Sequence, residues 1–133
     1  MRKSLVAILS VVSLMVAGLA FANGSPAPVS TPELKQVIGS NGKATLVFFQ
    51  NPYGRPCKMQ KEVLDKLQSD RKGNFNIAPV NAMKQEDQKA FYDYGVRSLP
   101  SLVLVDKSGK IARVFAPGIQ SIETLTSALD GLK

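Results

Sequence analysis

The feature that most limits the fold of this chain is a buried-strand pattern that runs directly into a turn and then a helix. Residues 44–50 form a continuous, mostly apolar run of strand-forming residues, typical of a strand covered on both faces of a sheet. Residues 51–56 contain two prolines and a glycine, which end that strand. A helix is predicted from 56 to 69, with Pro56 at its first position. Its expected apolar face comprises Met59, Val63, Leu64 and Leu67.

The rest of the chain continues this alternation, which indicates an α/β protein. The patterns predict a short helix capped by Thr31, a strand over 75–80, a helix over 84–94 ended by Gly95, a hairpin of strands 101–105 and 110–115, and a last helix capped by Ser121. The expected fold is a central mixed sheet of about four strands with helices on both faces and a C-terminal antiparallel hairpin. Strands that are joined by helices are expected to pair in parallel. Pro79 cannot donate to a ladder, so strand 75–80 is expected at a sheet edge.

The N-terminus has the pattern of a secretory signal peptide over residues 1–22. Arg2 and Lys3 precede an uncharged, mostly apolar stretch that ends in a small-x-small cleavage pattern at 20–22. The alternative is an uncleaved segment that spans a membrane. Residues 23–31, rich in Gly, Ser, Pro and Ala, are predicted to be a flexible linker, and residues 32–133 one domain. The expected location is the periplasm or the outside of the cell.

Composition excludes several kinds of site. The chain has no histidine and one cysteine, Cys57, so one chain holds neither a four-ligand zinc site, nor a histidine-based catalytic unit, nor an internal disulfide. No metal and no other cofactor is expected. The net charge is +7, but the basic residues are scattered, so nucleic-acid binding is not expected. A lone cysteine in an oxidising compartment indicates intermolecular pairing or a free reactive thiol.

Three motifs in this order and spacing resemble the thioredoxin family. They are Pro56-Cys57-Lys58 after the buried strand, Gly95-Val96-x-x-Leu99-Pro100 before the hairpin, and Gly118 after the last strand. The resemblance extends over roughly residues 32–132. It implies a thioredoxin-like fold with a redox motif at 54–57. It also implies that Pro100 is a cis-proline that faces this motif and helps to bind the substrate backbone.

The chain departs from the family pattern at the positions that carry redox chemistry. Gly54 stands where the family has the first, attacking cysteine, so the motif reads Gly54-Arg55-Pro56-Cys57 and Cys57 matches the resolving cysteine. Phe48 matches the family's buried acid and Pro79 its accompanying lysine. The family's first strand has no counterpart before residue 32, which agrees with an edge position for strand 75–80. With one sulfur, the chain cannot close its own disulfide as a two-cysteine oxidoreductase does.

Cys57 is the candidate catalytic thiol. It lies in the first helical turn between Arg55 and Lys58, a setting that favours the thiolate, although a free cysteine is equally compatible with a half-buried small hydrophobe. In one hypothesis, Cys57 forms mixed disulfides with the thiols or disulfides of a protein, a peptide or a small thiol, as a single-cysteine oxidoreductase.

Two other hypotheses do not require redox chemistry. In the first, Tyr53, Gly54 and the segment Leu99-Pro100 form the substrate-binding surface of a non-catalytic peptide- or protein-binding module. In the second, the chain is a structural subunit of a periplasmic complex and uses the edge strand near Pro79.

Overall fold

The computed structural model of the chain describes residues 24–132, and the signal peptide predicted over 1–22 lies outside the described residues. The elements, in chain order, are helix α1 (Pro32–Val37), strand β1 (Thr45–Gln50), helix α2 (Arg55–Asp70), strand β2 (Asn76–Asn81), 3₁₀ helix η1 (Gln85–Asp87), helix α3 (Gln88–Tyr94), strand β3 (Ser101–Val105), strand β4 (Ile111–Val114) and helix α4 (Ile122–Asp130). The helix expected over 84–94 therefore begins as a separate 3₁₀ turn.

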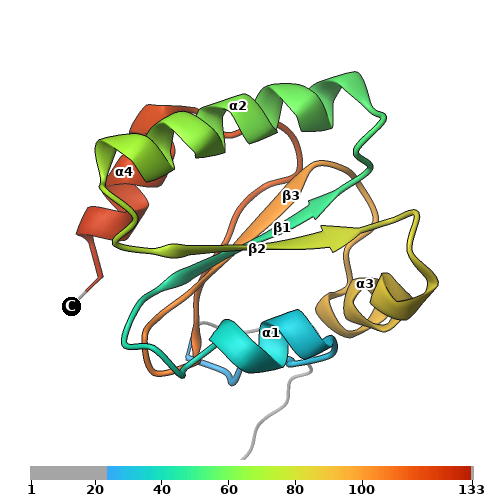
Figure 1. The fold of residues 1–133 in the computed structure, drawn as a ribbon, viewed down its shortest axis with the longest axis horizontal. Helices are drawn as coiled ribbons and strands as arrows, with labels where there is room; N and C mark the ends of the chain where they lie inside the picture. The colour runs from blue at the N-terminus through green and yellow to red at the C-terminus, as the bar shows by residue number, and fades with distance from the viewer. Residues whose placement is uncertain (1–23, 133) are drawn as a thin grey trace, which may run out of the picture.

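The strands form one mixed sheet in the order β2-β1-β3-β4. Helices α2 and α4 cover one face and α1 and α3 the other (Figure 1), as the predicted α/β fold requires. β1 and β2 are parallel, and β3 and β4 form the expected antiparallel hairpin.

The expectation that all helix-connected strands are parallel is wrong for β3, which runs antiparallel to β1. The physical reason is the place of the connection. α3 packs at the end of the sheet where β2 finishes (Figure 1), with Phe91 and Tyr94 against Phe49. The chain therefore enters β3 from the end of the sheet at which β2 finished.

The sheet separates two apolar cores, because successive residues of a strand point to opposite faces. In β1, Leu46 and Phe48 face α2 and α4, whereas Val47 and Phe49 face α1 and α3. The first core also contains Leu64, Leu67, Phe75, Leu102, Leu104, Phe115, Leu125 and Leu129. The second also contains Leu34, Ala78, Val80, Ala90, Tyr94, Val103, Val105 and Ile111. Each large apolar side chain buried here contributes roughly 1.5–3 kcal/mol.

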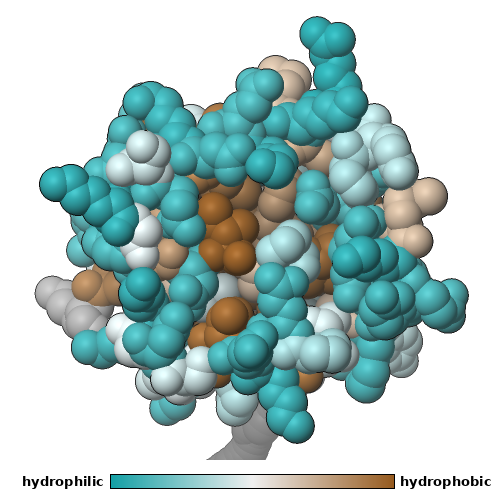
Figure 2. Space-filling model, viewed as in Figure 1, coloured by the Kyte–Doolittle hydropathy of each residue, from teal (hydrophilic) through white to brown (hydrophobic). Residues whose placement is uncertain are grey.

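β2 lies at the edge of the sheet, as its proline predicts. It pairs only with β1, and Pro79 is exposed. Figure 2 shows apolar atoms in the middle of this face of the molecule, between hydrophilic side chains above and below. The edge strand is therefore not covered by another strand of the described chain.

Few backbone donors remain free along this edge. The amides of Asn76 and Ala82 donate toward the β1 side, each at 2.8 Å, so by alternation the backbone N–H positions of residues 77, 79 and 81 point outward. Pro79 has no N–H, and Asn81 donates its N–H to the Asp87 carboxylate at 2.8 Å. A partner strand would find little to pair with here, which disfavours the structural-subunit hypothesis.

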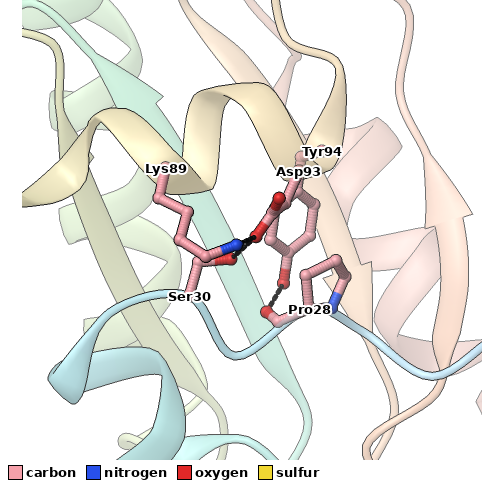
Figure 3. Close-up of polar contacts among 5 residues, drawn as sticks. All are labelled: Pro28, Ser30, Lys89, Asp93 and Tyr94. Atoms are coloured by element: carbon pink, nitrogen blue, oxygen red, sulfur yellow. Dashed lines mark hydrogen bonds and ion pairs between the residues drawn. The ribbon is translucent and has the colours of Figure 1, made fainter.

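The structure describes residues 24–31 of the expected linker, which are called the strap here. The strap is hydrogen-bonded to the domain. Gly24 donates its N–H to the carbonyl of Ile111 at 2.7 Å, and Ile111 donates back to Ser25 at 2.8 Å. Figure 3 shows the next contacts, in which the Tyr94 hydroxyl donates to the Pro28 carbonyl at 2.7 Å. The Gly, Ser, Pro and Ala content of the strap predicts a flexible linker. The strap is nevertheless held, because backbone hydrogen bonds to β4 depend little on side-chain type.

Candidate functional site

The candidate site begins at the turn between β1 and α2. The Asn51 side-chain oxygen accepts the N–H of Tyr53 at 3.0 Å, and the Asn51 backbone carbonyl accepts the N–H of Gly54 at 2.9 Å. These bonds fold residues 51–54 into a tight turn of the kind that asparagine favours. Gly54 is the N-cap of α2, with φ of −81° and no side-chain cap. The helix therefore begins at Arg55, one residue earlier than predicted.

Cys57 lies inside this turn, with only 2% of its surface exposed. Its Sγ accepts the N–H of Asn51 at 3.4 Å. Gly54 is directly beside the sulfur, because a Cβ at position 54 would lie 3.9 Å from the Cys57 Sγ, which is ordinary contact distance. The thiol is thus buried, and the position opposite it, where the family resemblance expects the first cysteine, carries no side chain.

The segment Leu99-Pro100 lies at the same end of the sheet. Phe49 pairs with Ser101, so β3 begins beside the point at which β1 ends. The Leu99–Pro100 peptide bond is cis, and Pro100 is buried. The Pro100 carbonyl accepts the N–H of Gly118 at 3.0 Å. Gly118 has φ of +111°, a conformation that favours glycine. Two of the three sequence motifs are therefore joined by a backbone hydrogen bond.

The exposed residues around the turn are mixed in character. Tyr53 is 77% exposed, and Leu99 is half-buried on the neighbouring segment. Arg55, Pro56 and Lys58 are exposed on the first turn of α2. The structure thus offers one large amphipathic ring and a short apolar segment as contact surface near the buried thiol.

The charge near the thiol is positive. The first turn of α2 contains no acidic residue, although acids are preferred at helix N-termini. Among the ion pairs of the described residues, none involves Arg55 or Lys58. The charges of Arg55 and Lys58 add to the positive end of the helix dipole. The resulting positive potential attracts an anionic or polarised group to this turn.

The positions that match the family's proton machinery hold no titratable group. Phe48 is 2% exposed and belongs to the core under α2 and α4. Pro79 is on the free edge of β2. Within residues 24–132, no three His, Cys, Asp or Glu side chains are grouped to hold a metal, and no helix is long and apolar enough to cross a membrane.

Comparison with known proteins places the chain. The family model described as a thioredoxin-like domain matches residues 32–133. The chain belongs to the thioredoxin-like family. Among curated thioredoxins, that of Pyropia yezoensis is 26% identical over 106 residues, which cover 80% of this chain and 95% of the relative. The thioredoxin of Haemophilus influenzae is 30% identical over 83 residues, which cover 62% of this chain and 75% of the relative.

Solved structures agree on the thioredoxin-like fold. A thioredoxin-like protein from Clostridium perfringens superposes with a TM-score of 0.63 at 22% identity, over 70% of this chain and 73% of that one. Thioredoxin-2, a component of the protein secretion machinery of a malaria parasite, superposes with a TM-score of 0.57 at 21% identity, over 68% of this chain and 84% of that one. Membership of this family suggests a redox or thiol-related function.

One residue of the site was not predicted. Gln60 is fully buried, whereas Met59, which the sequence assigns to the apolar face of α2, is 48% exposed. The buried face of the helix comprises Cys57, Gln60, Leu64 and Leu67. Gln60 is three residues after Cys57 and four before Leu64, so helical spacing places it on the inward face. This spacing was the only sequence signal that indicated its burial.

Proposed function

We propose that this thioredoxin-like protein is exported and acts in thiol–disulfide processes through mixed disulfides of Cys57. The observation that carries the proposal is the absence of a side chain at Gly54, where a Cβ would be in contact with the Cys57 Sγ at 3.9 Å. We infer that a partner's sulfur approaches Cys57 over Gly54 and takes the place of the missing first cysteine. Tyr53 precedes Gly54, and Leu99-Pro100 lies at the same end of the sheet, so both are proposed to contact the partner's chain.

The reaction is an ordinary exchange step. The Cys57 thiolate, its proton released to solvent, attacks one sulfur of a partner disulfide; a bond from Sγ to that sulfur forms, the partner's S–S bond breaks, and the other sulfur leaves as a thiolate. An external thiol, from a second protein or a small molecule such as glutathione, then attacks the mixed disulfide and releases Cys57. The helix N-terminus and the cations Arg55 and Lys58 attract an anionic or polarised partner group to the site.

The test uses oxidised glutathione with the purified protein, and mass spectrometry follows the addition of one glutathionyl group. Wild type is expected to form the adduct in the folded state, and Cys57→Ser to form none. Gly54→Ala is the matched variant, because φ of −81° accepts alanine and the new methyl would be in contact with the sulfur at 3.9 Å. It is expected to slow adduct formation about tenfold or more, while unfolded Gly54→Ala reacts like unfolded wild type. Equal rates for the two folded proteins would contradict entry at Gly54.

A second candidate is a non-catalytic peptide-binding module, which the 2% exposure of Cys57 favours. In that case Cys57→Ser retains partner binding, and Tyr53→Ala weakens it. Affinity capture by wild type, Cys57→Ser and Tyr53→Ala without reductant, followed by elution with a reductant, separates the candidates. Capture that needs Cys57 supports the mixed-disulfide proposal, and capture that needs only Tyr53 supports the binding module.

Export is proposed from residues 1–22 alone, whose charged start, apolar stretch and small-x-small ending are typical of a signal peptide. The location proposed is periplasmic or secreted. Fractionation of cells that express the full chain, with mass spectrometry of its N-terminus, is expected to find a protein that starts at Asn23 outside the cytoplasm. A chain that keeps residues 1–22 in the membrane fraction would indicate the anchored alternative.

A further inference from the structure

Gln60 makes an unusual pair of hydrogen bonds to the backbone of one distant residue. Its Nε2 donates to the carbonyl of Gln120 at 3.1 Å, and its Oε1 accepts the N–H of Gln120 at 2.6 Å. The side chain is 0% exposed. A buried amide is stable only when its polar atoms are bonded, so this pair fixes the distance between α2 and residue 120. The two hydrogen bonds are called the Gln60 clamp here.

The clamp holds one end of a short segment, residues 115–121, that connects β4 to α4. The other anchor of this segment is the N–H of Gly118, which donates to the Pro100 carbonyl at 3.0 Å. Ile119 is between the two anchored residues and is 43% exposed. Gln60 is one helical turn after Cys57, on the same buried face of α2. The clamp therefore connects the helix of the thiol to the segment that holds Pro100.

We propose that Gln60 is a positioning residue of the candidate site, which sets where Gly118 and Pro100 lie relative to Cys57. The expected consequence is that peptide disulfides reach Cys57 in a defined orientation. That consequence, but not the positioning itself, rests on the proposed function. A core leucine at this position fills the same volume and cannot fix residue 120. Because the two hydrogen bonds point in opposite senses, they hold both the position and the orientation of the Gln120 peptide unit.

Gln60→Met removes both hydrogen bonds and keeps the length of the side chain. The first readout is amide hydrogen exchange, measured by NMR, at Gly118, whose hydrogen bond is to Pro100 and not to Gln60. Exchange at Gly118 and Gln120 is expected to be about tenfold faster in Gln60→Met, the factor for loss of one hydrogen bond. Leu67→Ala is the control, because it leaves a core cavity in the same helix without touching the clamp. It is expected to leave local exchange at Gly118 unchanged.

Gln60→Glu distinguishes a hydrogen-bonding role from a packing role, because only the hydrogen-bonding role makes the exchange rate at Gly118 depend on pH. When protonated, the introduced carboxyl supplies the same donor and acceptor as the amide. When ionised, it turns a second acceptor toward the Gln120 carbonyl and loses that hydrogen bond. The exchange rate at Gly118, relative to wild type at the same pH, is expected to be near one at pH ~4 and about tenfold higher at pH ~8. A ratio that does not change with pH would overturn the proposal.

The second readout compares two reagents on Cys57, a disulfide-linked dimer of an octapeptide with one cysteine and the small disulfide 5,5′-dithiobis(2-nitrobenzoate). The ratio of the peptide rate to the small-reagent rate is expected to fall about tenfold in Gln60→Met and to stay constant in Leu67→Ala. If wild type reacts with neither reagent, the proposed function fails. The exchange rate at Gly118 then still tests whether Gln60 positions that residue. If wild type reacts with both and the ratio is unchanged in Gln60→Met, the positioning proposal fails while the proposed function stands.

Discussion

At the scale of single residues, the missing side chain at Gly54 matters as much as the thiol beside it. A Cβ there would lie 3.9 Å from the Cys57 Sγ and 3.3 Å from the Asn51 carbonyl oxygen, close but without a severe clash. The extended φ of −81° suits any L-residue. The turn therefore accepts a side chain at position 54 when the Asn51 carbonyl moves by a few tenths of an ångström, although the chain has one cysteine.

Gly54→Cys is expected to restore an internal disulfide with Cys57. A disulfide places the Cβ of one cysteine about 3 Å from the Sγ of the other, so the Cys57 side chain must turn toward position 54 to close the 3.9 Å separation. The measurement is a free-thiol count, expected to be zero after mild oxidation and two after reduction, and Gly54→Ser is the control. Persistence of two free thiols after oxidation would mean that the turn holds the sulfurs apart.

Asp93 is a second residue whose surroundings determine a measurable property. Its Oδ2 accepts a hydrogen bond from the Ser30 hydroxyl at 2.5 Å and one from Lys89 at 2.9 Å (Figure 3). The hydrogen bond from Ser30 and then that from Lys89 lower the pKa of Asp93 from its usual 3.8. A carboxyl with a lowered folded-state pKa stabilises the fold above its unfolded-state pKa, and the contribution disappears as pH falls through the folded-state value.

Ser30→Ala is therefore expected to be destabilising at neutral pH and much less so in acid. The free energy of unfolding should fall by about 1 kcal/mol at pH ~7, the value of one hydrogen bond, and the difference from wild type should shrink toward pH ~3. Urea unfolding at the two pH values measures this, with the exposed helical residue Ser127→Ala as control. An equal loss at both pH values would mean that Ser30 acts through packing and not through the carboxylate.

At the scale of secondary-structure elements, the exposed strand β2 is protected by two specific devices. Pro79 removes one outward N–H, and the Asp87 carboxylate occupies the N–H of Asn81 at 2.8 Å. Natural sheets commonly guard their edges in this way, because unpaired donors and acceptors recruit a second strand.

Removal of both devices is expected to cause self-association. The double variant Pro79→Val with Asp87→Ala frees two outward N–H groups on β2. We expect a concentration-dependent dimer in sedimentation equilibrium. The control, Pro79→Val with Glu62→Ala, removes the same charge from the exposed face of α2 and should stay monomeric. A monomeric double variant would show that the short strand alone prevents pairing.

The elements were largely predictable from sequence because their signals are local. The apolar run of β1, the capping residue Ser121 and the glycine that ends α3 each act within a few residues. The direction of β3 was not predictable from the alternation of helices and strands, because it depends on where α3 packs, and α3 packs at the end of the sheet where β2 finishes. Gln60 was also missed, because its hydrogen-bond partner is 60 residues away and a glutamine on a helix is usually solvated.

At the scale of the whole molecule, the two cores share one sheet. Leu34 of α1 and Leu125 of α4 are fully buried on opposite faces. β1 contributes alternate residues to both cores, so neither face is expected to stay folded when the other is disrupted.

Leu34→Ala and Leu125→Ala are each expected to lower the free energy of unfolding by about 2–5 kcal/mol through cavity formation. In both variants, urea denaturation should remain one transition that coincides by circular dichroism and by tyrosine fluorescence. Two separate transitions in either variant would mean that the faces unfold independently. The conservative control is Leu125→Met, which keeps most of the volume and should cost less than about 1.5 kcal/mol.

The strap has a consequence for the orientation of the molecule. Gly24 is bonded to Ile111, and Ile111 pairs with Val105, the last residue of β3. Cys57 and Pro100 are at the other end of the sheet, where β3 begins. A five-residue strand separates these ends by about 17 Å. A bead, a fusion partner or a surface attached through the N-terminus would therefore hold the protein with the cysteine facing outward, toward the solution from which partners arrive.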